Sequence, residues 1–435
     1  MKITVIGAGS SYTPELSANL IEYQNHMNVD QVVLMDLNRE KLELIRKVSQ
    51  KLLDQSGSKI NVVATQNLDE AIAGANFVLL QIRVGGLAAR VRDETLPMEF
   101  GMVGNETTGA GGFVCGLRTV PVALHIARQV ENLAPDAWLL NLSNPSGMVT
   151  EAILNYTGVQ ALGFCNIPIN TTYAIGRVLN VDPNEIQLDS FGLNHLSWTR
   201  AAYLEGKEIL KPVLDTAGSR DSILYRRGLV EEMIDPGWLD TIHMIPGWYL
   251  RYFYYPAQVL EEDRRQGYTK GADDMRAEER LHAIYSGEGY TPEAREILSN
   301  KGGAQYYLPV LQVIDSMIHD RGDVVVVDTT NQGVIPDLPP NACVEVPAKV
   351  FKNRVEPLPV GPLPLTVRGL VQTVKNYETL AIESAITGNR KTAIAALMAH
   401  PLVDSYPTAS AFFKRVLENE RDYLPQFFQD ITGEH

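Results

Sequence analysis

The chain has few cysteines and comparatively few basic residues, and both shortages exclude classes of protein. Its 435 residues include only three cysteines, Cys115, Cys165 and Cys343, too few for a disulfide framework. We therefore expect a reducing, cytoplasmic location. Lysine and arginine number 38 against 52 aspartates and glutamates, a net charge of -14. This charge argues against nucleic acid or an anionic membrane surface as the main partner.

Long apolar runs and repeats are also missing. No uninterrupted run approaches the roughly 18 apolar residues that a membrane span needs, so none is expected. The N-terminus opens with a strand pattern instead of a signal sequence, and no segment is low-complexity or repeated. The composition is that of an ordinary globular protein, with 45% hydrophobic residues and enough length for two domains.

Short apolar runs alternate with helical patterns in the first part of the chain. The runs lie at 2–6, 31–35, 61–64, 77–82, 137–140 and 160–164. Strands that are apolar throughout and separated by helices are typical of a parallel sheet covered on both faces. We therefore predict an α/β protein whose residues 1–168 form a Rossmann-like, doubly wound domain.

The regularity weakens after about residue 170. The pattern there predicts a hairpin near 199–207, helices at 221–234, 274–286, 305–319, 367–387, 391–398 and 408–428, and a strand at 323–327. We assign residues 169–435 to a mixed, largely helical α+β domain for substrate and metal binding and for oligomerisation. No Gly/Ser/Pro-rich linker separates the two parts, so we expect them to pack closely, with the site between them.

The first strand leads into Gly7-Ala-Gly9 and then into a helix, an order that lets backbone amides approach a pyrophosphate. Tyr12 stands where the usual third glycine would be, so the pattern could also be a turn that binds nothing. Asp36 ends the second strand, where a carboxylate accepts hydrogen bonds from ribose hydroxyls and repels a 2′-phosphate. We therefore expect NAD. The predicted cofactor-binding residues are Gly7, Gly9, Ser10, Ser11, Tyr12, Thr13, Asp36, Arg39 and Arg83.

A cysteine and a histidine stand at breaks in the pattern, in Gly163-Phe-Cys165-Asn166 and Gly192-Leu-Asn-His195. Taken alone, each could be an ordinary core residue. Thiolate and imidazole suit a borderline-soft divalent metal, and two protein ligands leave open positions for a substrate. A metal beside a nicotinamide suggests redox chemistry at a carbon that bears a hydroxyl.

Other polar or aromatic segments follow predicted strands. Arg83 and Arg90, Gly104-Asn-Glu106 and Ser143-Asn144-Pro145 fall at or after strand ends, where open sheets bind ligands, although each alone could serve a cap or turn. The aromatic run 248–255 reads as a core or interface helix. One of its tyrosines could act as a base if a metal or cation lowers its pKa.

Together these segments resemble glycoside hydrolase family 4, the NAD- and metal-dependent glycosidases. The resemblance covers nearly the whole chain, and its markers are Gly7-Ala-Gly-Ser-Ser-Tyr-Thr-Pro-Glu-Leu16, Gly104-Asn-Glu-Thr-Thr-Gly109, Ser143-Asn-Pro145, Cys165-Asn-Ile-Pro168 and Gly192-Leu-Asn-His195. Within the family, the Cys-Asn-Ile-Pro form is similar to the 6-phospho-β-glucosidases. The resemblance thus implies hydrolysis of 6-phospho-β-glucosides, of the cellobiose 6-phosphate type, to glucose 6-phosphate and an aglycone.

The resemblance also implies a mechanism. Bound NAD oxidises C3 of the sugar, a base removes the C2 proton, the aglycone leaves by elimination, water adds, and C3 is reduced again. A metal, usually Mn²⁺, acts as Lewis acid on the sugar oxygens. Cys165 and His195 match its protein ligands, Tyr249 matches the base, and Glu106 matches the acid that raises the tyrosine's basicity. Asn166 is assigned to catalysis and to substrate binding, and the other expected substrate contacts are Arg90, Asn144 and Lys270.

The chain departs from the family pattern at two positions. Lys270 and Lys301 stand where arginine is usual, and lysine lacks the bidentate fork that suits phosphate. An unphosphorylated glycoside, or one with another anionic group on C6, is therefore an alternative substrate. An ordinary NAD-dependent 2-hydroxy acid dehydrogenase and a non-catalytic sensor are the alternatives outside the glycosidases. The family resemblance implies a homodimer or homotetramer.

Overall fold

Six parallel strands at the centre of the molecule follow the order β3-β2-β1-β4-β5-β6, as in a dinucleotide-binding fold. The computed structural model describes residues 1–24, 26–303 and 306–428. The parallel strands are β1 (Lys2–Ile6), β2 (Gln31–Met35), β3 (Asn61–Thr65), β4 (Phe77–Leu80), β5 (Trp138–Asn141) and β6 (Gln160–Gly163). The predicted fold class is confirmed, and each predicted strand in this part lies within two residues of an observed one.

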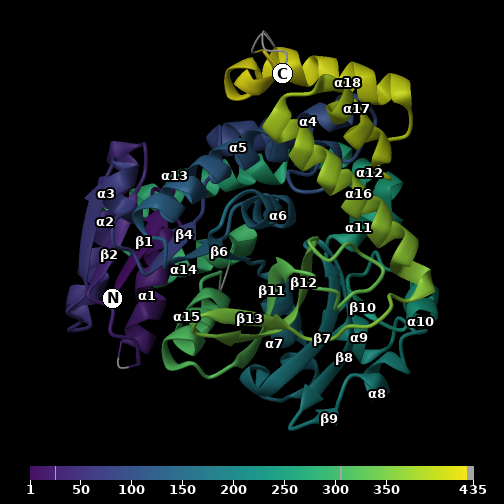
Figure 1. Ribbon diagram of the computed structural model, residues 1–435. Coiled ribbons are helices and arrows are strands. Elements are labelled where there is room, and N and C mark those ends of the chain that lie inside the picture. The colour runs from purple at the N-terminus through teal and green to yellow at the C-terminus, as the bar shows by residue number, and fades with distance from the viewer. Residues whose placement is uncertain (25, 304–305, 429–435) are drawn as a thin grey trace.

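Helices cover both faces of this sheet, so that β1, β4 and β5 are buried along nearly their whole length (Figure 1). The helices that follow these strands in the chain are α1 (Thr13–Tyr23), α2 (Arg39–Gln55), α3 (Leu68–Ile72), α4 (Gly86–Glu99), α5 (Gly109–Leu133), α6 (Ser146–Tyr156) and α7 (Ile167–Leu179). By length and composition, α5 could cross a membrane. However, 83% of its most apolar 18-residue window is buried inside the molecule, as in a core helix.

The C-terminal half adds three antiparallel strands to the same sheet. They are β11 (Asp323–Thr330), β12 (Cys343–Phe351) and β13 (Arg354–Pro357), and β11 meets β6 where Asp328 pairs with Gly163. The sequence pattern predicted only part of β11. The division at residue 168 stays a prediction, since one nine-stranded sheet draws strands from both parts.

A second, antiparallel sheet stands beside the first (Figure 1). It contains β7 (Ile186–Leu193), β8 (Leu196–Leu204), β9 (Lys207–Glu208) and β10 (Ile245–Pro246). The predicted hairpin is present as β8 and β9. The tight turn between β7 and β8 contains His195 in the left-handed region, at φ 62°, so this sheet carries one of the predicted metal ligands.

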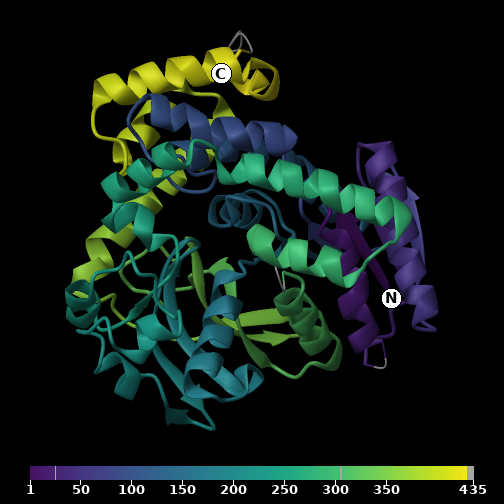
Figure 2. The ribbon, with the colours of Figure 1, turned by 180° about the vertical axis from the view of Figure 1, so that it is seen from behind.

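Among the remaining helices, α13 packs against α4 (Figure 2), and α17 packs against α16 and α18 at one end of the molecule. The remaining helices are α8 (Lys211–Leu214), α9 (Ile223–Arg226), α10 (Pro236–Ile242), α11 (Leu250–Tyr254), α12 (Pro256–Gln266), α13 (Lys270–Gly287), α14 (Pro292–Leu298), α15 (Leu308–His319), α16 (Leu365–Thr387), α17 (Arg390–Ala399) and α18 (Tyr406–Asn419).

Two predicted helices differ from the observed ones. The prediction of one helix over 221–234 is wrong, because α9 ends after one turn and Gly228 takes a left-handed φ of 68°. The last helix ends at Asn419 and is followed by two short 3-10 turns. The helix predicted from residue 305 begins at Leu308, and residue 305 lies outside the described residues.

Candidate active site

A cleft of about 1310 Å³ opens at the carboxyl ends of the parallel strands, between the nucleotide turn and the C-terminal half. Most of the predicted site residues line it: Gly7, Gly9, Ser10, Ser11, Tyr12, Asp36, Arg83, Arg90, Glu106, Asn144, Cys165, Asn166, His195, Tyr249 and Lys270. Two predicted cofactor residues are not on this wall. Thr13 is buried, with its hydroxyl accepting a hydrogen bond from Gln81 at 2.8 Å, and Arg39 is exposed at the start of α2.

The turn after β1 is built so that only glycine fits at two positions. Gly7 has a φ of 85°, and a Cβ there would lie 2.6 Å from the carbonyl oxygen of Gln81. A Cβ on Gly9 would lie 2.9 Å from the carboxylate of Asp36. That carboxylate accepts hydrogen bonds from the amides of Gly9 and Asn38, both at 2.8 Å. The close approach of backbone and carboxylate is the arrangement that a dinucleotide requires.

Residues from the C-terminal half hold the next part of this turn. Lys301 donates a hydrogen bond from Nζ to the Ser11 hydroxyl at 3.1 Å and lies 5.0 Å from the centre of the Tyr12 ring. The Tyr285 hydroxyl donates to the Ser11 carbonyl at 2.8 Å. Burial lowers the pKa of Lys301. Lys301 therefore contacts the nucleotide turn. In the sequence it stood out only as a departure from the family pattern.

Cys165 and His195 offer two soft ligands on the opposite wall. Cys165 lies between β6 and α7, and its sulfur accepts a hydrogen bond from the Ile167 amide at 3.5 Å. Burial raises the pKa of the thiol. His195 is buried, its pKa is lowered to about 3 by desolvation, and its Nδ1 atom has no hydrogen-bond partner among the described residues. A neutral imidazole with a free nitrogen and a nearby thiol fit a divalent metal.

A metal held here would keep positions for other ligands. Among residues 1–24, 26–303 and 306–428, no group of three or more His, Cys, Asp or Glu side chains is arranged to hold a metal ion. A catalytic metal needs open positions, whereas a structural site is closed by protein ligands. Asn166 lies beside the thiol, with Oδ1 4.0 Å from the Cys165 sulfur, and is the residue at the start of α7.

Tyr249 packs directly on His195. The two rings are stacked with their centres 3.8 Å apart and their planes 8° apart. Burial raises the pKa of Tyr249, and nearby Tyr252 and Cys165 raise it further, whereas Arg90 and a hydrogen bond with Thr107 lower it. The phenol therefore needs additional positive charge before it can serve as a base near neutral pH.

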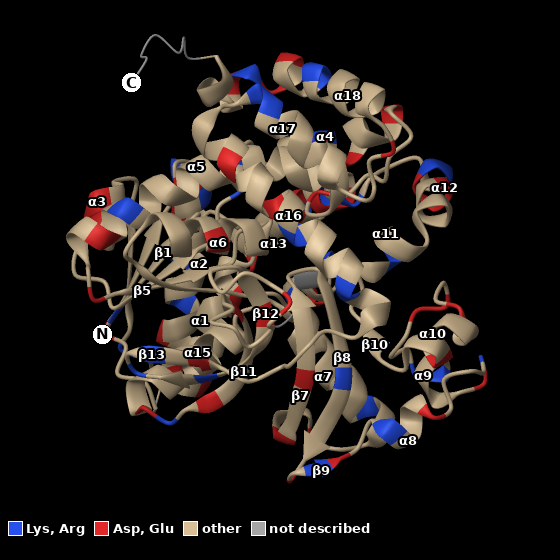
Figure 3. Cartoon of the chain, turned by 45° about the vertical axis from the view of Figure 1, so that its right-hand side comes forward, with Lys and Arg blue, Asp and Glu red and all other residues tan. Residues whose placement is uncertain are grey.

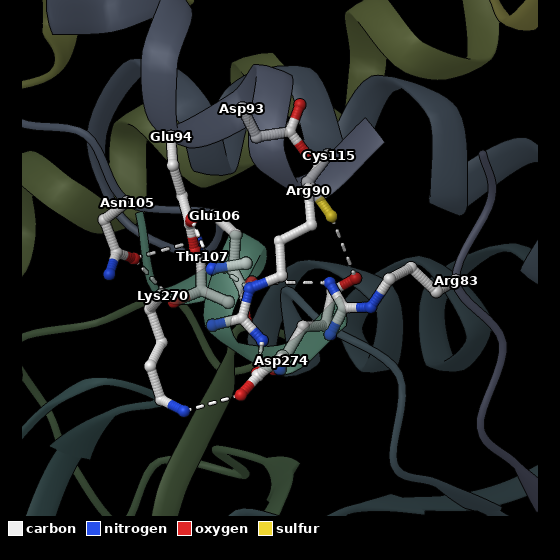
Figure 4. A network of polar contacts seen from close by, with 12 residues as sticks. Arg83, Arg90, Asp93, Glu94, Asn105, Glu106, Thr107, Cys115, Lys270 and Asp274 are labelled. Atoms are coloured by element: carbon white, nitrogen blue, oxygen red, sulfur yellow. Dashed lines mark hydrogen bonds and ion pairs between the residues drawn. The ribbon is translucent and has the colours of Figure 1, made fainter. Parts of the chain in front are cut away.

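Arg90 is the centre of a polar network on α4, α13 and the segment before α5 (Figure 4). Its guanidinium donates to Glu94 at 2.9 Å and to Asp274 at 2.6 Å, and it forms an ion pair with Glu106. Glu106 therefore contacts the guanidinium that partly offsets the burial-driven rise in the Tyr249 pKa. Arg83 approaches the same Glu106 carboxylate at 3.5 Å.

The same network ends in Lys270, whose ammonium lies 2.5 Å from the Asp274 carboxylate. Arg83, Arg90 and Lys270 thus face three carboxylates, those of Glu94, Glu106 and Asp274. Acidic and basic residues are similarly interspersed over the surrounding helices (Figure 3). An anionic group on a substrate would have to compete with carboxylates for every one of these cations.

Glu94, Asp274, Trp248 and Arg251 also line the cleft but were not among the predicted site residues. Two of them carry a sequence signal, because Arg90/Glu94 and Lys270/Asp274 are oppositely charged pairs four residues apart on helices. The meeting of the two pairs depends on the packing of α13 against α4, which no local pattern predicts.

The arrangement defines a dinucleotide-type enzyme with a second site for a metal and a polar substrate, and comparison with known proteins identifies its family. The model of the family 4 glycosyl hydrolases matches residues 2–181, and that of their C-terminal domain matches residues 190–403. The chain belongs to this family, as the motifs predicted. It is a glycosidase by family, and neither the dehydrogenase nor the sensor interpretation is supported.

Individual relatives are similar over the whole length. The chain is 35% identical to a probable 6-phospho-beta-glucosidase of Bacillus subtilis, covering 100% of this chain and 99% of the relative. It is 32% identical to the 6-phospho-beta-glucosidase of Escherichia coli, covering 99% and 98%. The 6-phospho-beta glucosidase of Thermotoga maritima, solved with manganese, NAD⁺ and glucose 6-phosphate, has a TM-score of 0.88 at 29% identity, covering 97% and 99%.

Proposed function

We propose that this chain hydrolyses 6-phospho-β-glucosides to glucose 6-phosphate and an aglycone, with bound NAD and Mn²⁺. One observation carries the proposal: the glycine turn with Asp36, the Cys165/His195 pair and Tyr249 all line one cleft. The relatives named as 6-phospho-beta-glucosidases, one of them solved with manganese, NAD⁺ and glucose 6-phosphate, support the same substrate and cofactors.

Different residues of the chain would bind the dinucleotide, the metal and the sugar. The backbone of the glycine turn after β1 would hold the phosphates of the dinucleotide, and Asp36 would accept hydrogen bonds from its ribose hydroxyls and exclude a 2′-phosphate. Cys165 and His195 would hold the metal. When bound, NAD⁺ supplies a hydride acceptor and Mn²⁺ a Lewis acid. Asn144 and Asn166 are proposed to orient the sugar hydroxyls by hydrogen bonding.

Proton transfer falls to Tyr249. We assign it the removal of the proton on C2 of the sugar, because its ring stacks on His195 and Arg90 partly offsets the rise in its pKa that burial causes. Glu106 is a positioning residue, which fixes the Arg90 guanidinium by an ion pair. Lys270 is half-exposed at the cleft and is the proposed contact for the phosphate on C6.

Location, assembly and domain division are further proposals. All three cysteines are free among the described residues, which supports a reducing cytoplasm. We also propose a homodimer or homotetramer, and a division of the chain into a cofactor domain at 1–168 and a substrate domain at 169–435. Size-exclusion chromatography with light scattering tests the assembly, and separate expression of the two parts tests the division.

A substrate panel tests the activity. p-Nitrophenyl α- and β-glycosides, each with and without a 6-phosphate, are assayed with NAD⁺ and Mn²⁺. We expect cleavage of 6-phospho-β-glucoside, a strict need for added NAD⁺, and no accumulation of NADH, because the hydride returns to C3. NADH that grows in step with product would indicate a plain dehydrogenase and would overturn the proposal.

A second candidate substrate is a glycoside with another anionic group on C6, or with none. The observation that favours it is the pairing of Lys270 with Asp274 at 2.5 Å, which leaves no unpaired cation in the Arg90 network. Faster turnover of an unphosphorylated glycoside than of the 6-phosphate in this panel, or of a p-nitrophenyl glucuronide added to it, would select this candidate.

A further inference from the structure

Trp248, a large aromatic side chain, remains exposed on the wall of the cleft, directly before the proposed base in the chain. It keeps 47% of its surface accessible although it lines the cleft. Tyr268 and Met275 line the same cleft and are 45% and 37% exposed. Apolar surface that stays exposed inside a binding cleft is a mark of a site for a ligand.

The Trp248 ring is held in place although it is exposed. The rings of Tyr249 and Tyr252 meet it nearly at right angles, with centres 5.4 and 5.9 Å away. The Arg251 guanidinium lies over the ring at 5.2 Å and is itself fixed by a 2.6 Å hydrogen bond to Glu262. A ring already held by three neighbours loses little freedom when a ligand stacks on it.

The position of Trp248 relative to Tyr249 identifies the part of the substrate that it can reach. If Tyr249 removes the proton on C2, then C1 is one bond from the reacting carbon, and the group on C1 extends past the tyrosine. The phosphate is on C6, which is attached to C5, on the opposite side of the ring oxygen from C1. Lys270, the proposed phosphate contact, begins α13, whereas Trp248 directly precedes Tyr249 at the start of α11. The Trp248 ring is therefore assigned to the C1 side of the sugar.

We propose that Trp248 forms the binding platform for the aglycone, which is a pyranose or aryl ring whose apolar face stacks on the indole. This inference rests on the proposed function and adds the residue that selects the leaving group. Aromatic stacking contributes beyond the area that it buries, so the platform favours ring aglycones over small ones. Trp248 contacts substrate but takes no part in proton transfer.

The test compares Trp248→Ala and Trp248→Phe with the wild type on three 6-phospho-β-glucosides, which carry glucosyl, p-nitrophenyl or methyl aglycones. For Trp248→Ala we expect KM to rise about tenfold for the two ring aglycones, with Phe restoring much of the loss. The methyl glycoside should keep its kcat/KM, and the inhibition constant of glucose 6-phosphate should not change. Tyr156→Ala, which removes a ring of similar exposure outside the cleft wall, is the matched control.

The outcomes separate this inference from the proposed function. A wild type that cleaves none of the three glycosides overturns both. An active wild type with unchanged KM in Trp248→Ala overturns the platform alone. An equal loss for methyl and ring aglycones, or weaker inhibition by glucose 6-phosphate, would show that Trp248 only supports Tyr249 and would also overturn it. A loss limited to the aryl substrate, or to the glucosyl one, supports the platform and identifies its preferred ring.

Discussion

The two walls of the cleft are built in different ways. The nucleotide wall is largely backbone: Gly7 and Gly9 leave no room for a Cβ, and Asp36 is fixed by amide hydrogen bonds. The sugar wall is made of side chains from segments far apart in the sequence, among them Cys165, His195 and Tyr249. Substitutions on the nucleotide wall should therefore change affinity for the cofactor, whereas substitutions on the sugar wall should change the rate of the chemistry.

The largest effect is expected from Tyr249→Phe. Loss of an essential base should reduce kcat by about 10²–10⁴-fold, measured as the initial rate on a 6-phospho-β-glucoside. The fold should survive, because Phe retains the ring that stacks on His195. Affinity for NAD⁺ should stay within about twofold of the wild type, since the phenol does not belong to the nucleotide wall.

Tyr254→Phe is the matched control, because Tyr254 ends α11, the short helix that Tyr249 directly precedes, and its ring packs on Trp238 with centres 4.4 Å apart. It should cost little activity, and so should Phe at Tyr255. Substrate deuterated at C2 should exchange its label with solvent in the wild type and not in Tyr249→Phe. Normal activity in Tyr249→Phe, together with loss of activity on substitution of a neighbouring tyrosine, would show that the base was assigned to the wrong ring.

The next largest effect concerns the two soft ligands. Cys165→Ser and His195→Ala should each lower metal-dependent turnover by at least about 100-fold, since even residues that only support metal ligands typically cost 10–100-fold. Titration of Mn²⁺ by calorimetry should show weaker binding, while NAD⁺ affinity is kept. Cys343→Ala, which removes a buried thiol of β12, should bind metal as the wild type does.

Chelation offers an independent measurement of the same wall. EDTA should stop turnover, and added Mn²⁺ with a thiol reductant should restore it, because only the reduced cysteine is a good ligand. A wild-type rate that chelators leave unchanged would contradict the metal assignment. That result would not affect the assignment of the nucleotide wall, so only the assignment of the sugar wall would fail.

The same contrast explains what sequence could predict. The glycine turn and the parallel strands follow local rules, since each strand is a short apolar run and Gly7 and Gly9 adjoin the first of them. β12 was missed because Pro347 lies inside it, and proline in a run argues against a strand. On the sugar wall, breaks in the pattern singled out Cys165 and His195 and the resemblance matched them to metal ligands, but the stacking of Tyr249 on His195 depends on tertiary packing.

A smaller effect is expected on the nucleotide wall from Asp36→Asn. Asparagine retains one acceptor oxygen for the two amides that Asp36 now serves but loses the charge that favours ribose hydroxyls and repels a 2′-phosphate. The Kd for NAD⁺ should rise about tenfold, and discrimination against NADP⁺ should decrease. At saturating NAD⁺ the value of kcat should be close to wild type. A large fall in kcat would show that the two walls are coupled.

The smallest effect is expected from Lys270→Arg, which tests how this chain recognises a phosphate without the arginine usual in its family. The Lys270 ammonium forms an ion pair with the Asp274 carboxylate at 2.5 Å, and the Arg90 guanidinium binds the same carboxylate at 2.6 Å. Arginine presents a planar fork that can keep the Asp274 contact with one edge and bind phosphate oxygens with the other. We therefore expect KM for 6-phospho-β-glucosides to fall about two- to fivefold, with kcat little changed.

Lys270→Met should act in the opposite direction, because it removes the cation and leaves Asp274 facing the phosphate. Its KM should rise for phosphorylated substrates and stay constant for unphosphorylated ones, while Lys207→Met, on the exposed strand β9, should change neither. If both Lys270 variants leave the KM for phosphorylated substrates unchanged, the phosphate lies elsewhere on the sugar wall. Because Lys301 is held by Ser11 at 3.1 Å on the nucleotide side, the Arg83 and Arg90 side chains would then be the next cations to substitute.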